Sequence, residues 1–242
     1  MLFIAFVALI ALVLLLAFLV YASFHISSGV YVQAFCRGNT PDKKVALTFD
    51  DGPHEKYTPQ VLDILYKYKA KASFFVIGKN VKGHEKILMR MKDDGHIIGV
   101  HSQTHHSAFP FFSVSKIIKE LRLCARRIEY ITGYAPVWFR PPFGVTNPSI
   151  ASAIKKQDFL VAGWNIRSLD TVIDKNRVIQ KVLSRLQPGA IVLLHDHLPD
   201  APYILEEILK HATEQGYEFV TVEEMYTISH KKGYRKKRYR RK

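Results

Sequence analysis

The sequence has 242 residues, of which 48% are hydrophobic and 12% aromatic, and its formal net charge at pH 7 is +14. This length is sufficient for one domain with a sizeable buried core in addition to an N-terminal segment. Despite its positive charge, the sequence has no nucleic-acid-binding motif and carries an apolar export segment, so nucleic acid is not expected as a partner.

Residues 2–22 form a continuous apolar segment without a charged side chain. About 20 apolar residues are needed to cross a bilayer as a helix, so we predict one transmembrane helix that anchors the chain in a membrane. Val20 and Ala22 would also suit a signal peptidase, and cleavage after Ala22 remains an alternative. In both cases the rest of the chain is expected outside the cytoplasm, in the cell envelope or periplasm. Residues 23–42 are expected to be a linker.

Residues 43–226 alternate short strand-type segments with amphipathic helical segments, which predicts a single α/β domain. The expected strands are residues 45–49, 72–76, 97–100, 137–139, 160–166, 190–194 and 218–222. Helical periodicity marks residues 59–69, 85–92, 114–131, 176–186 and 201–215. Segments that alternate in this way form parallel strands joined by right-handed crossovers, in an open sheet or a barrel.

Side chains with catalytic or metal-binding chemistry follow several of the expected strands. They are Asp50, Asp51, His101, His105, Arg140, Asp170, His195 and Asp196. Because the carboxyl ends of parallel strands meet at one edge, these side chains are expected to converge on one site.

The segment HSQTHH at residues 101–106 indicates a metal site. His101 and His105 are four residues apart and would share one face of a helical turn. Two imidazoles and one carboxylate can hold a divalent cation and leave positions open for water and substrate. Adjacent Asp50 and Asp51 in TFDDGP can divide the remaining work, one as a ligand and the other as a base.

Four motifs occur in an order that resembles the polysaccharide deacetylases, carbohydrate esterase family four, also called the NodB-type homology domain. The motifs are TFDDGP, HSQTH, RPPFG and LLHD, at residues 48–53, 101–105, 140–144 and 193–196. The resemblance extends from about residue 43 to 225 and implies a distorted (β/α) barrel of about seven parallel strands. It also implies a metal-dependent hydrolase that removes N-acetyl groups from an N-acetylhexosamine polymer, such as peptidoglycan or a chitin-like glycan.

The resemblance also implies a metal-binding set. Carried over onto this sequence, the metal ligands would be Asp51, His101 and His105. We expect one divalent ion, with zinc as the first choice, although cobalt or another divalent ion would suit the same ligands.

The remaining catalytic roles follow from the same motifs. By resemblance, Asp50 would be the general base, Arg140 would orient Asp50, and His195 would be the general acid. A backbone N–H near Phe143, which follows Pro142 in the RPPFG turn, could hold the oxyanion.

Aromatic residues near the motifs have two interpretations. Trp164, Phe109, Phe111 and Phe112 could line a groove for sugar rings or pack in the core. The sequence does not distinguish between these roles.

The chain departs from the family pattern after the fifth expected strand. Family members usually carry two carboxylates followed by Trp there, whereas this chain reads RSLDT, with Arg167 and Thr171 at the outer positions. We expect either Asp170 or Asp196 to support the catalytic imidazole of His195.

The C-terminal segment dominates the charge of the chain. Residues 227–242 are expected to be a basic, disordered tail, and nine of residues 231–242 are Lys or Arg, which leaves a net charge of only +5 for the rest. Such a tail could bind anionic envelope polymers or lipids, or could simply aid solubility. Cys36 and Cys124 could pair outside the cell or stay free.

A second functional class uses the same fold. The chain could be a catalytically silent, membrane-anchored protein that binds glycan or organises the envelope. The intact acid, base and ligand positions favour the enzyme.

Overall fold

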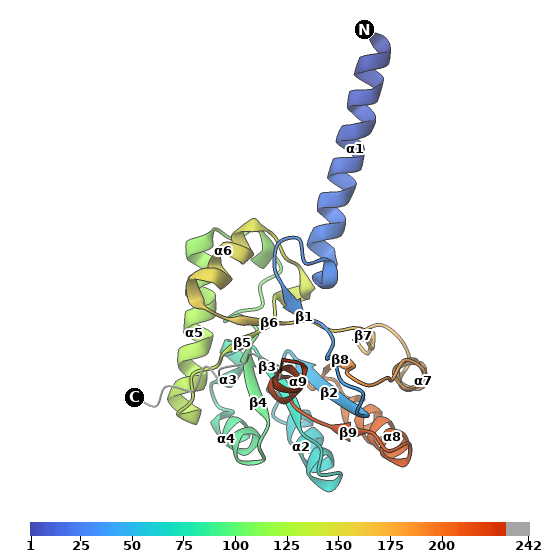
Figure 1. Cartoon of the computed structure of the whole chain (residues 1–242). Coiled ribbons are helices and arrows are strands. Elements are labelled where there is room, and N and C mark those ends of the chain that lie inside the picture. The colour runs from blue at the N-terminus through green and yellow to red at the C-terminus, as the bar shows by residue number, and fades with distance from the viewer. Residues whose placement is uncertain (231–242) are drawn as a thin grey trace.

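The computed structural model describes residues 1–230, so the basic segment 231–242 lies outside the described residues. The described chain forms a curled sheet of parallel strands with helices around it (Figure 1). The strands are β1 (Ala34–Phe35), β2 (Lys44–Asp50), β3 (Ala72–Val76), β4 (Ile97–Val100), β5 (Trp138–Phe139), β6 (Leu160–Ala162), β7 (Ile166–Arg167), β8 (Ile191–His195) and β9 (Glu218–Phe219). The helices are α1 (Leu2–Phe24), α2 (Tyr57–Lys67), α3 (Gly78–Val81), α4 (Glu85–Asp93), α5 (Val114–Thr132), α6 (Pro148–Gln157), α7 (Lys175–Leu183), α8 (Ala201–Glu214) and α9 (Val222–Ser229).

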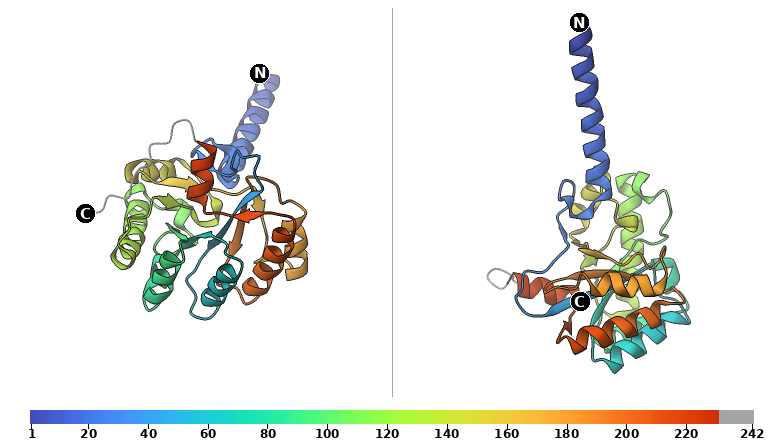
Figure 2. Two further views of the ribbon diagram at one scale, coloured as in Figure 1. Left: turned by 60° about the horizontal axis from the view of Figure 1, so that its bottom comes forward. Right: turned by 90° about the vertical axis from the view of Figure 1, so that its right-hand side faces the viewer.

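The strand order is β1-β6-β5-β4-β3-β2-β8-β7, and β9 pairs with β2. Each neighbouring pair of these strands is parallel. The predicted distorted barrel is therefore confirmed as a curled sheet of parallel strands. Helices surround its outer face, as two further views show (Figure 2).

The segment 160–166 is two strands and not the single strand that was expected. β6 pairs with β5 and β1, whereas β7 pairs with β8 at the other end of the sheet. Between them, the N–H of Gly163 donates to the carbonyl of Phe35 and the N–H of Asn165 donates to that of Ile191. The chain thus crosses the gap between the two ends of the sheet and brings them together.

Residues 23–42 are folded against the sheet, in contrast to the expected linker. This segment contains a short 3-10 helix (Ile26–Ser28) and strand β1, whose residues pair with Val161 and Ala162 of β6. Ile26 and Val32 are buried in the hydrophobic core.

The C-terminal end of the domain also differs from expectation. The strand expected at 218–222 ends at Phe219, and α9 begins at Val222. The hydroxyl of Thr221 accepts a hydrogen bond from the N–H of Glu224, so Thr-x-x-Glu acts as a helix N-cap signal here. Residues 227–229, expected in the tail, belong to α9.

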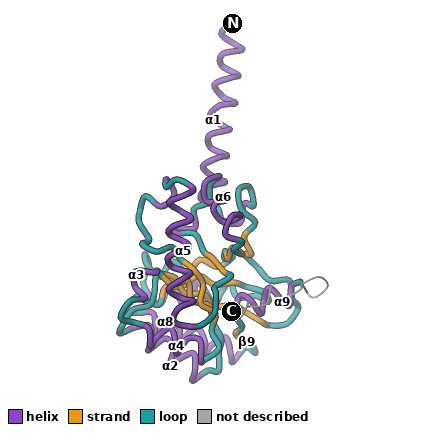
Figure 3. The backbone as a smooth tube through the Cα atoms, turned by 90° about the vertical axis from the view of Figure 1, so that its left-hand side faces the viewer, coloured by secondary structure: helices purple, strands orange, loops and turns teal. Residues whose placement is uncertain are grey.

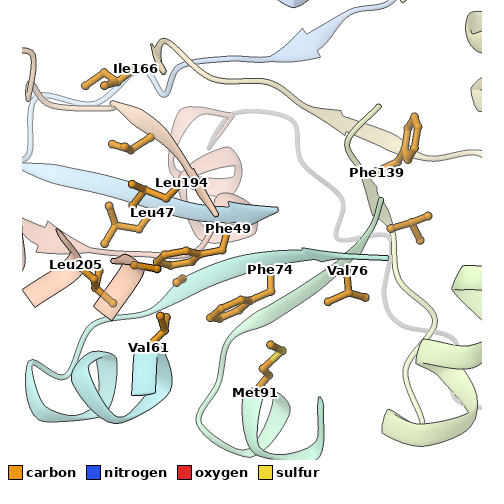
Figure 4. Packing of buried hydrophobic residues seen from close by; sticks show 14 of the residues in the cluster. Leu47, Phe49, Val61, Phe74, Val76, Met91, Phe139, Ile166, Leu194 and Leu205 are labelled. Atoms are coloured by element: carbon orange, nitrogen blue, oxygen red, sulfur yellow. The ribbon is translucent and has the colours of Figure 1, made fainter. Parts of the chain in front are cut away.

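The core has two layers on either side of the curled sheet. Alternate residues of β2 and its neighbours, including Leu47, Phe49, Phe74 and Leu194, pack against the outer helices (Figure 4). Trp138 and other residues on the inner face of the sheet pack against α9. Two packed layers hold the strand ends rigidly, which positions the site.

Helix α1 extends away from the domain (Figure 3). Most of its side chains are exposed, and it is long and apolar enough to cross a membrane by length and composition alone. Among the described residues it is the one helix with this property.

Candidate active site

The two carboxylates of TFDDGP point in different directions because the strand ends between them. Asp50 is the last residue of β2, and Asp51 adopts a left-handed backbone with φ of 74°. Oδ1 of Asp50 lies 2.8 Å from Nη1 of Arg140, while Oδ1 of Asp51 faces the two histidines. The side chain of Asn80 donates to the carbonyl of Asp51 and holds this turn.

Asp51, His101 and His105 come together as the sequence predicted. Oδ1 of Asp51 lies 3.5 Å from Nε2 of His101 and 3.4 Å from Nε2 of His105. One ligand atom from each residue lies within 4.8 Å of the others. Segment 101–106 is a loop and not the helical turn considered from the spacing, and Ser102 and His105 have positive φ.

The chemistry of these three residues fits a divalent cation. Nδ1 of His101 lies 2.8 Å from the carbonyl oxygen of Arg140, which can only accept, so Nδ1 carries the proton and the lone pair of Nε2 faces Asp51. Burial lowers the pKa of His101 to about 3, which keeps the imidazole neutral, as metal binding requires. Oδ1 of Asp51 is buried without a hydrogen-bond partner among the described residues.

Asp50 is buried against the guanidinium of Arg140, which donates hydrogen bonds to four acceptors. Arg140 donates to Asp50, to the hydroxyl of Thr48, and to the carbonyls of Ala162 and Gly163. Burial raises the pKa of Asp50 above its ordinary range, and the charge of Arg140 opposes this rise. The guanidinium therefore holds the carboxylate in one orientation beside Asp51, His101 and His105, which together form the metal-type cluster.

His195 is bound to Asp170 by two hydrogen bonds. Its Nδ1 and its backbone N–H are each 2.8 Å from a carboxylate oxygen of Asp170, and the hydroxyl of Ser168 donates to the same carboxylate. Burial lowers the pKa of His195, but the hydrogen bond and charge of Asp170 outweigh this and raise it to about 9. Nε2 of His195 is left facing Asp51, 3.9 Å from its Oδ2.

Asp196, the alternative partner for His195, has a different contact. Its Oδ2 accepts a hydrogen bond of 2.6 Å from the hydroxyl of Thr58, and burial raises its pKa to about 7. A Cβ at Gly52 would lie 2.3 Å from this carboxylate. Asp196 therefore packs under the TFDDGP turn, and Asp170 is the carboxylate bonded to the imidazole.

A cavity of about 240 Å³ joins these groups. Its lining includes Asp50, Asp51, His101, His105, Phe143, Trp164, Arg167, Asp170 and His195. Phe143 is half exposed with φ of 62°, and its ring lies 4.6 Å from that of His105. Pro142 is buried beside it in the same turn, and an added Cβ at Gly144 would meet the Trp164 ring at 2.4 Å.

The other aromatic candidates do not line this cavity. Phe109 and Phe112 are buried in the core, whereas Phe111 is largely exposed in the loop before α5. Cys36 and Cys124 are both free thiols, and burial raises the pKa of Cys124 to about 12.

Sequence reasoning missed residues that shape the site from behind. The buried carboxylate of Glu120 accepts hydrogen bonds from the N–H groups of Gln103 and Thr104 and from the Thr104 hydroxyl, which sets the HSQTH loop. The sequence did contain a sign that Glu120 is buried, because Glu120 lies between Ile117 and Leu121 on the apolar side of its helix. Thr48 and Ser168, which contact Arg140 and Asp170, carried no comparable signal.

The fold and site together have the arrangement of a carbohydrate esterase family 4 domain, namely a curled parallel sheet with an Asp-His-His cluster at its carboxyl edge, flanked by an Asp-Arg and a His-Asp pair. Residues 37–162 match the family described as polysaccharide deacetylase, and the chain belongs to this family.

Relatives with known names support this membership. Peptidoglycan-N-acetylmuramic acid deacetylase PdaC of Bacillus subtilis is 37% identical over 191 residues, which cover 78% of this chain and 40% of PdaC. The chain thus spans less than half of that relative. Other curated relatives are peptidoglycan-N-acetylmuramic acid or N-acetylglucosamine deacetylases. The solved structure of PdaC has a TM-score of 0.73 at 34% identity, covering 78% of this chain and 92% of that one.

Two further solved structures bear on the chemistry. A family 4 acetyl xylan esterase from Clostridium thermocellum, in complex with a cobalt ion, has a TM-score of 0.71 at 34% identity and covers 76% of this chain and 91% of its own. A CE4 family pseudoenzyme from Bacillus anthracis has a TM-score of 0.73 at 28% identity, covering 80% of this chain and 68% of its own. Proteins with this fold thus include one solved with a cobalt ion and one described as a pseudoenzyme.

Proposed function

We propose that this chain is a membrane-anchored, metal-dependent deacetylase that removes N-acetyl groups from peptidoglycan or a related N-acetylhexosamine glycan. The carrying observation is the arrangement of three candidate ligands, Asp51, His101 and His105, between a buried carboxylate and a carboxylate-bound imidazole. With Asp50 as a base and His195 as an acid beside one bound cation, the site would supply the groups that amide hydrolysis requires.

The residues of the chain would divide the reaction among them. Asp50, held by Arg140, accepts the proton of the attacking water, and the scissile C–N bond breaks as His195 donates its Nε2 proton to the departing sugar nitrogen. Asp170 keeps the imidazole charged and oriented through Nδ1. The products are acetate and a free amine.

Two groups would stabilise charge that develops on the acetyl oxygen. A divalent cation held by Asp51, His101 and His105, with zinc as our first choice and cobalt as an alternative, would supply Lewis-acid polarisation of the carbonyl and a lower pKa for water. The backbone N–H of Phe143, in the turn that begins at Pro142, would donate a hydrogen bond to the oxyanion. Trp164 and the ring of Phe143 would contact the sugar.

The proposed location of the enzyme is based on its apolar N-terminal helix and its basic C-terminal segment. Helix α1 would anchor the chain, with the catalytic domain in the cell envelope, outside the cytoplasm. The nine basic residues of segment 231–242 would attract anionic envelope polymers or lipids, and this attraction should weaken as salt is raised.

Metal analysis combined with acetate release tests the proposal. Purified protein should contain one divalent ion per chain and release acetate from N-acetylated glycan. Chelation should abolish the release, and zinc or cobalt should restore it. Full activity in metal-free protein would contradict the mechanism.

A silent glycan-binding or scaffolding role is the second candidate. Two observations favour it, namely the fold shared with a pseudoenzyme and the position of Arg167 in the cavity lining. Binding of glycan without acetate release, in protein shown to contain the metal, would establish this alternative.

A further inference from the structure

The end of α1 is bonded to the loop that follows the active-site turn. The carbonyl of Ser23 accepts a 2.9 Å hydrogen bond from the N–H of Thr146, and the carbonyl of Ala22 accepts one from the Thr146 hydroxyl. Ala22 is fully buried, whereas the helix before it is exposed. Thr146 follows Phe143 of the cavity by three residues, so their Cα atoms are at most about 11 Å apart. The base of α1 therefore lies beside the active site without an intervening linker.

A second loop runs from the metal-type cluster to the same place. Residues 106–113 follow His105, and the side-chain amide of Asn147, next to Thr146, donates a 2.6 Å hydrogen bond to the carbonyl of Pro110. Phe111, the next residue, exposes 88% of its surface. Helix α6, which Asn147 caps, lies at the end of the domain from which α1 leaves (Figure 1). This end therefore presents an exposed phenyl ring near the base of α1.

The segments near the base of α1 carry basic side chains and few acidic ones, with the exposed Asp158 after α6 as an acidic residue next to them. Residues 1–41, 101–119 and 140–157 contain no Asp or Glu. The same segments carry four exposed lysines, Lys116, Lys119, Lys155 and Lys156. Segments that carry lysines and no acidic side chain complement the anionic headgroups of a bilayer.

The length of α1 leaves little distance between the domain and the membrane. Its 23 residues extend for about 35 Å at 1.5 Å per residue. The hydrocarbon core of a bilayer is about 30 Å thick, or about 40–45 Å with its headgroups. A helix that spans this core therefore ends within the headgroup layer, and the bonds to Thr146 bring the domain to the same level.

We propose that the face formed by the base of α1 and loop 106–113 rests on the bilayer, with Phe111 in the headgroup region, and that the site acts on glycan attached to membrane lipid. On membrane-surface elements Phe, like Trp and Leu, is buried about 5–10 Å into the boundary between headgroups and acyl chains, and an exposed phenyl ring at this height fits that layer. The substrate part of this inference rests on the proposed deacetylase function. It narrows that function from glycan in general to lipid-linked glycan.

Fluorescence from the full chain in vesicles of zwitterionic and anionic phospholipid tests the docking. After subtraction of the wild-type signal, the Phe111→Trp chain should emit at shorter wavelength than the control chain. Its emission should also be quenched by lipids brominated near the headgroups. The matched control is Tyr130→Trp, because Tyr130 is 92% exposed and lies 16 residues after the start of α5, about 24 Å along the helix. Equal, water-like emission and absence of quenching at both positions would overturn the docking.

Acetate release from three forms of one N-acetylated oligosaccharide tests the substrate class. The forms are free in solution, tethered to lipid through a short spacer, and tethered through a long flexible spacer, the last two in the same vesicles as the enzyme. We expect acetate release from the oligosaccharide on the short tether to be several-fold faster than from the one on the long tether. Phe111→Ala should reduce this preference several-fold and leave the rate on free oligosaccharide unchanged, and Tyr130→Ala should change neither.

The outcomes separate the two proposals. Hydrolysis of all three forms without a preference for the short tether would refute the lipid-linked substrate and leave the deacetylase function intact. No acetate from any form, in metal-loaded protein, would refute the deacetylase function, and the fluorescence comparison would then decide the docking independently.

Discussion

The two ion pairs that flank the metal-type cluster differ in burial and therefore in what they can do. The side chains of Arg140 and Asp50 are 0% and 6% exposed, whereas His195, 17% exposed, faces the cavity with Asp170 behind it. A guanidinium stays charged at all relevant pH values, but an imidazole gains or loses its proton near neutrality. One pair thus holds a carboxylate in place, and the other contains the group that we propose to donate a proton.

The largest effect should come from removing the charge of the buried pair's carboxylate. Asp50→Asn keeps the shape and the contact with Arg140 but cannot accept a proton, so turnover should fall by about 10²–10⁴. Metal content, measured by elemental analysis, should remain near the wild-type value. Asp51→Asn is the matched control and should lose metal. The reverse pattern would mean that the two aspartates have exchanged roles.

Removing the cation of the buried pair should affect folding as well as activity. Arg140→Met leaves the Asp50 carboxylate buried without its partner, which should lower the free energy of unfolding by about 3–5 kcal/mol. Urea denaturation followed by circular dichroism measures this change. Arg122→Met is a suitable control, because Arg122 is exposed and bonded only to the surface residue Gln157 in the described contacts. Equal stability of the two variants would show that the buried pair contributes little.

The His195–Asp170 pair should determine the alkaline limb of the pH profile of activity. If His195 is the proposed general acid, it acts in its protonated form, and activity should decline as pH rises through its raised pKa of about 9. Asp170→Asn removes the charge that raises this pKa, and the alkaline limb of kcat/KM should move to lower pH with a reduced maximum. Asp196→Asn should leave the limb in place, since Asp196 bonds to Thr58. A shift in Asp196→Asn alone would transfer the supporting role to that residue.

The smallest effect should come from the hydroxyl behind the same pair. Ser168→Ala removes one hydrogen bond to the Asp170 carboxylate, which at about 1.5–3 kcal/mol for a charged acceptor is an upper bound on the loss. We expect a rate reduction below about tenfold, with the two bonds from Asp170 to His195 retained. A loss as large as that of Asp170→Asn would mean that Ser168 is needed to place the Asp170 carboxylate. Ser168 would then count as a third member of the His195–Asp170 pair.

The metal-type cluster shows what the spacing of histidines in the sequence can and cannot predict. His101 and His105 do converge on Asp51, but through a loop with positive φ at Ser102 and His105 and not through a helical turn. The loop conformation depends on Glu120, whose carboxylate binds two backbone N–H groups of the loop from a helix that follows it in the chain. Residue types and strand ends were thus sufficient to find the cluster, and the path of the backbone was not predictable from them.

The sequence by itself determined the parallel α/β class, the edge where the reactive side chains gather and an apolar segment of membrane-spanning length, because these follow from local periodicity and residue type. Only the tertiary structure decided that residues 160–166 cross the gap between two sheet ends, that the expected linker joins β6, and that Asp170 and not Asp196 bonds to His195. These features depend on contacts between segments far apart in the chain, such as Ser23 with Thr146. Such contacts form when the whole sheet closes, and no local pattern encodes them.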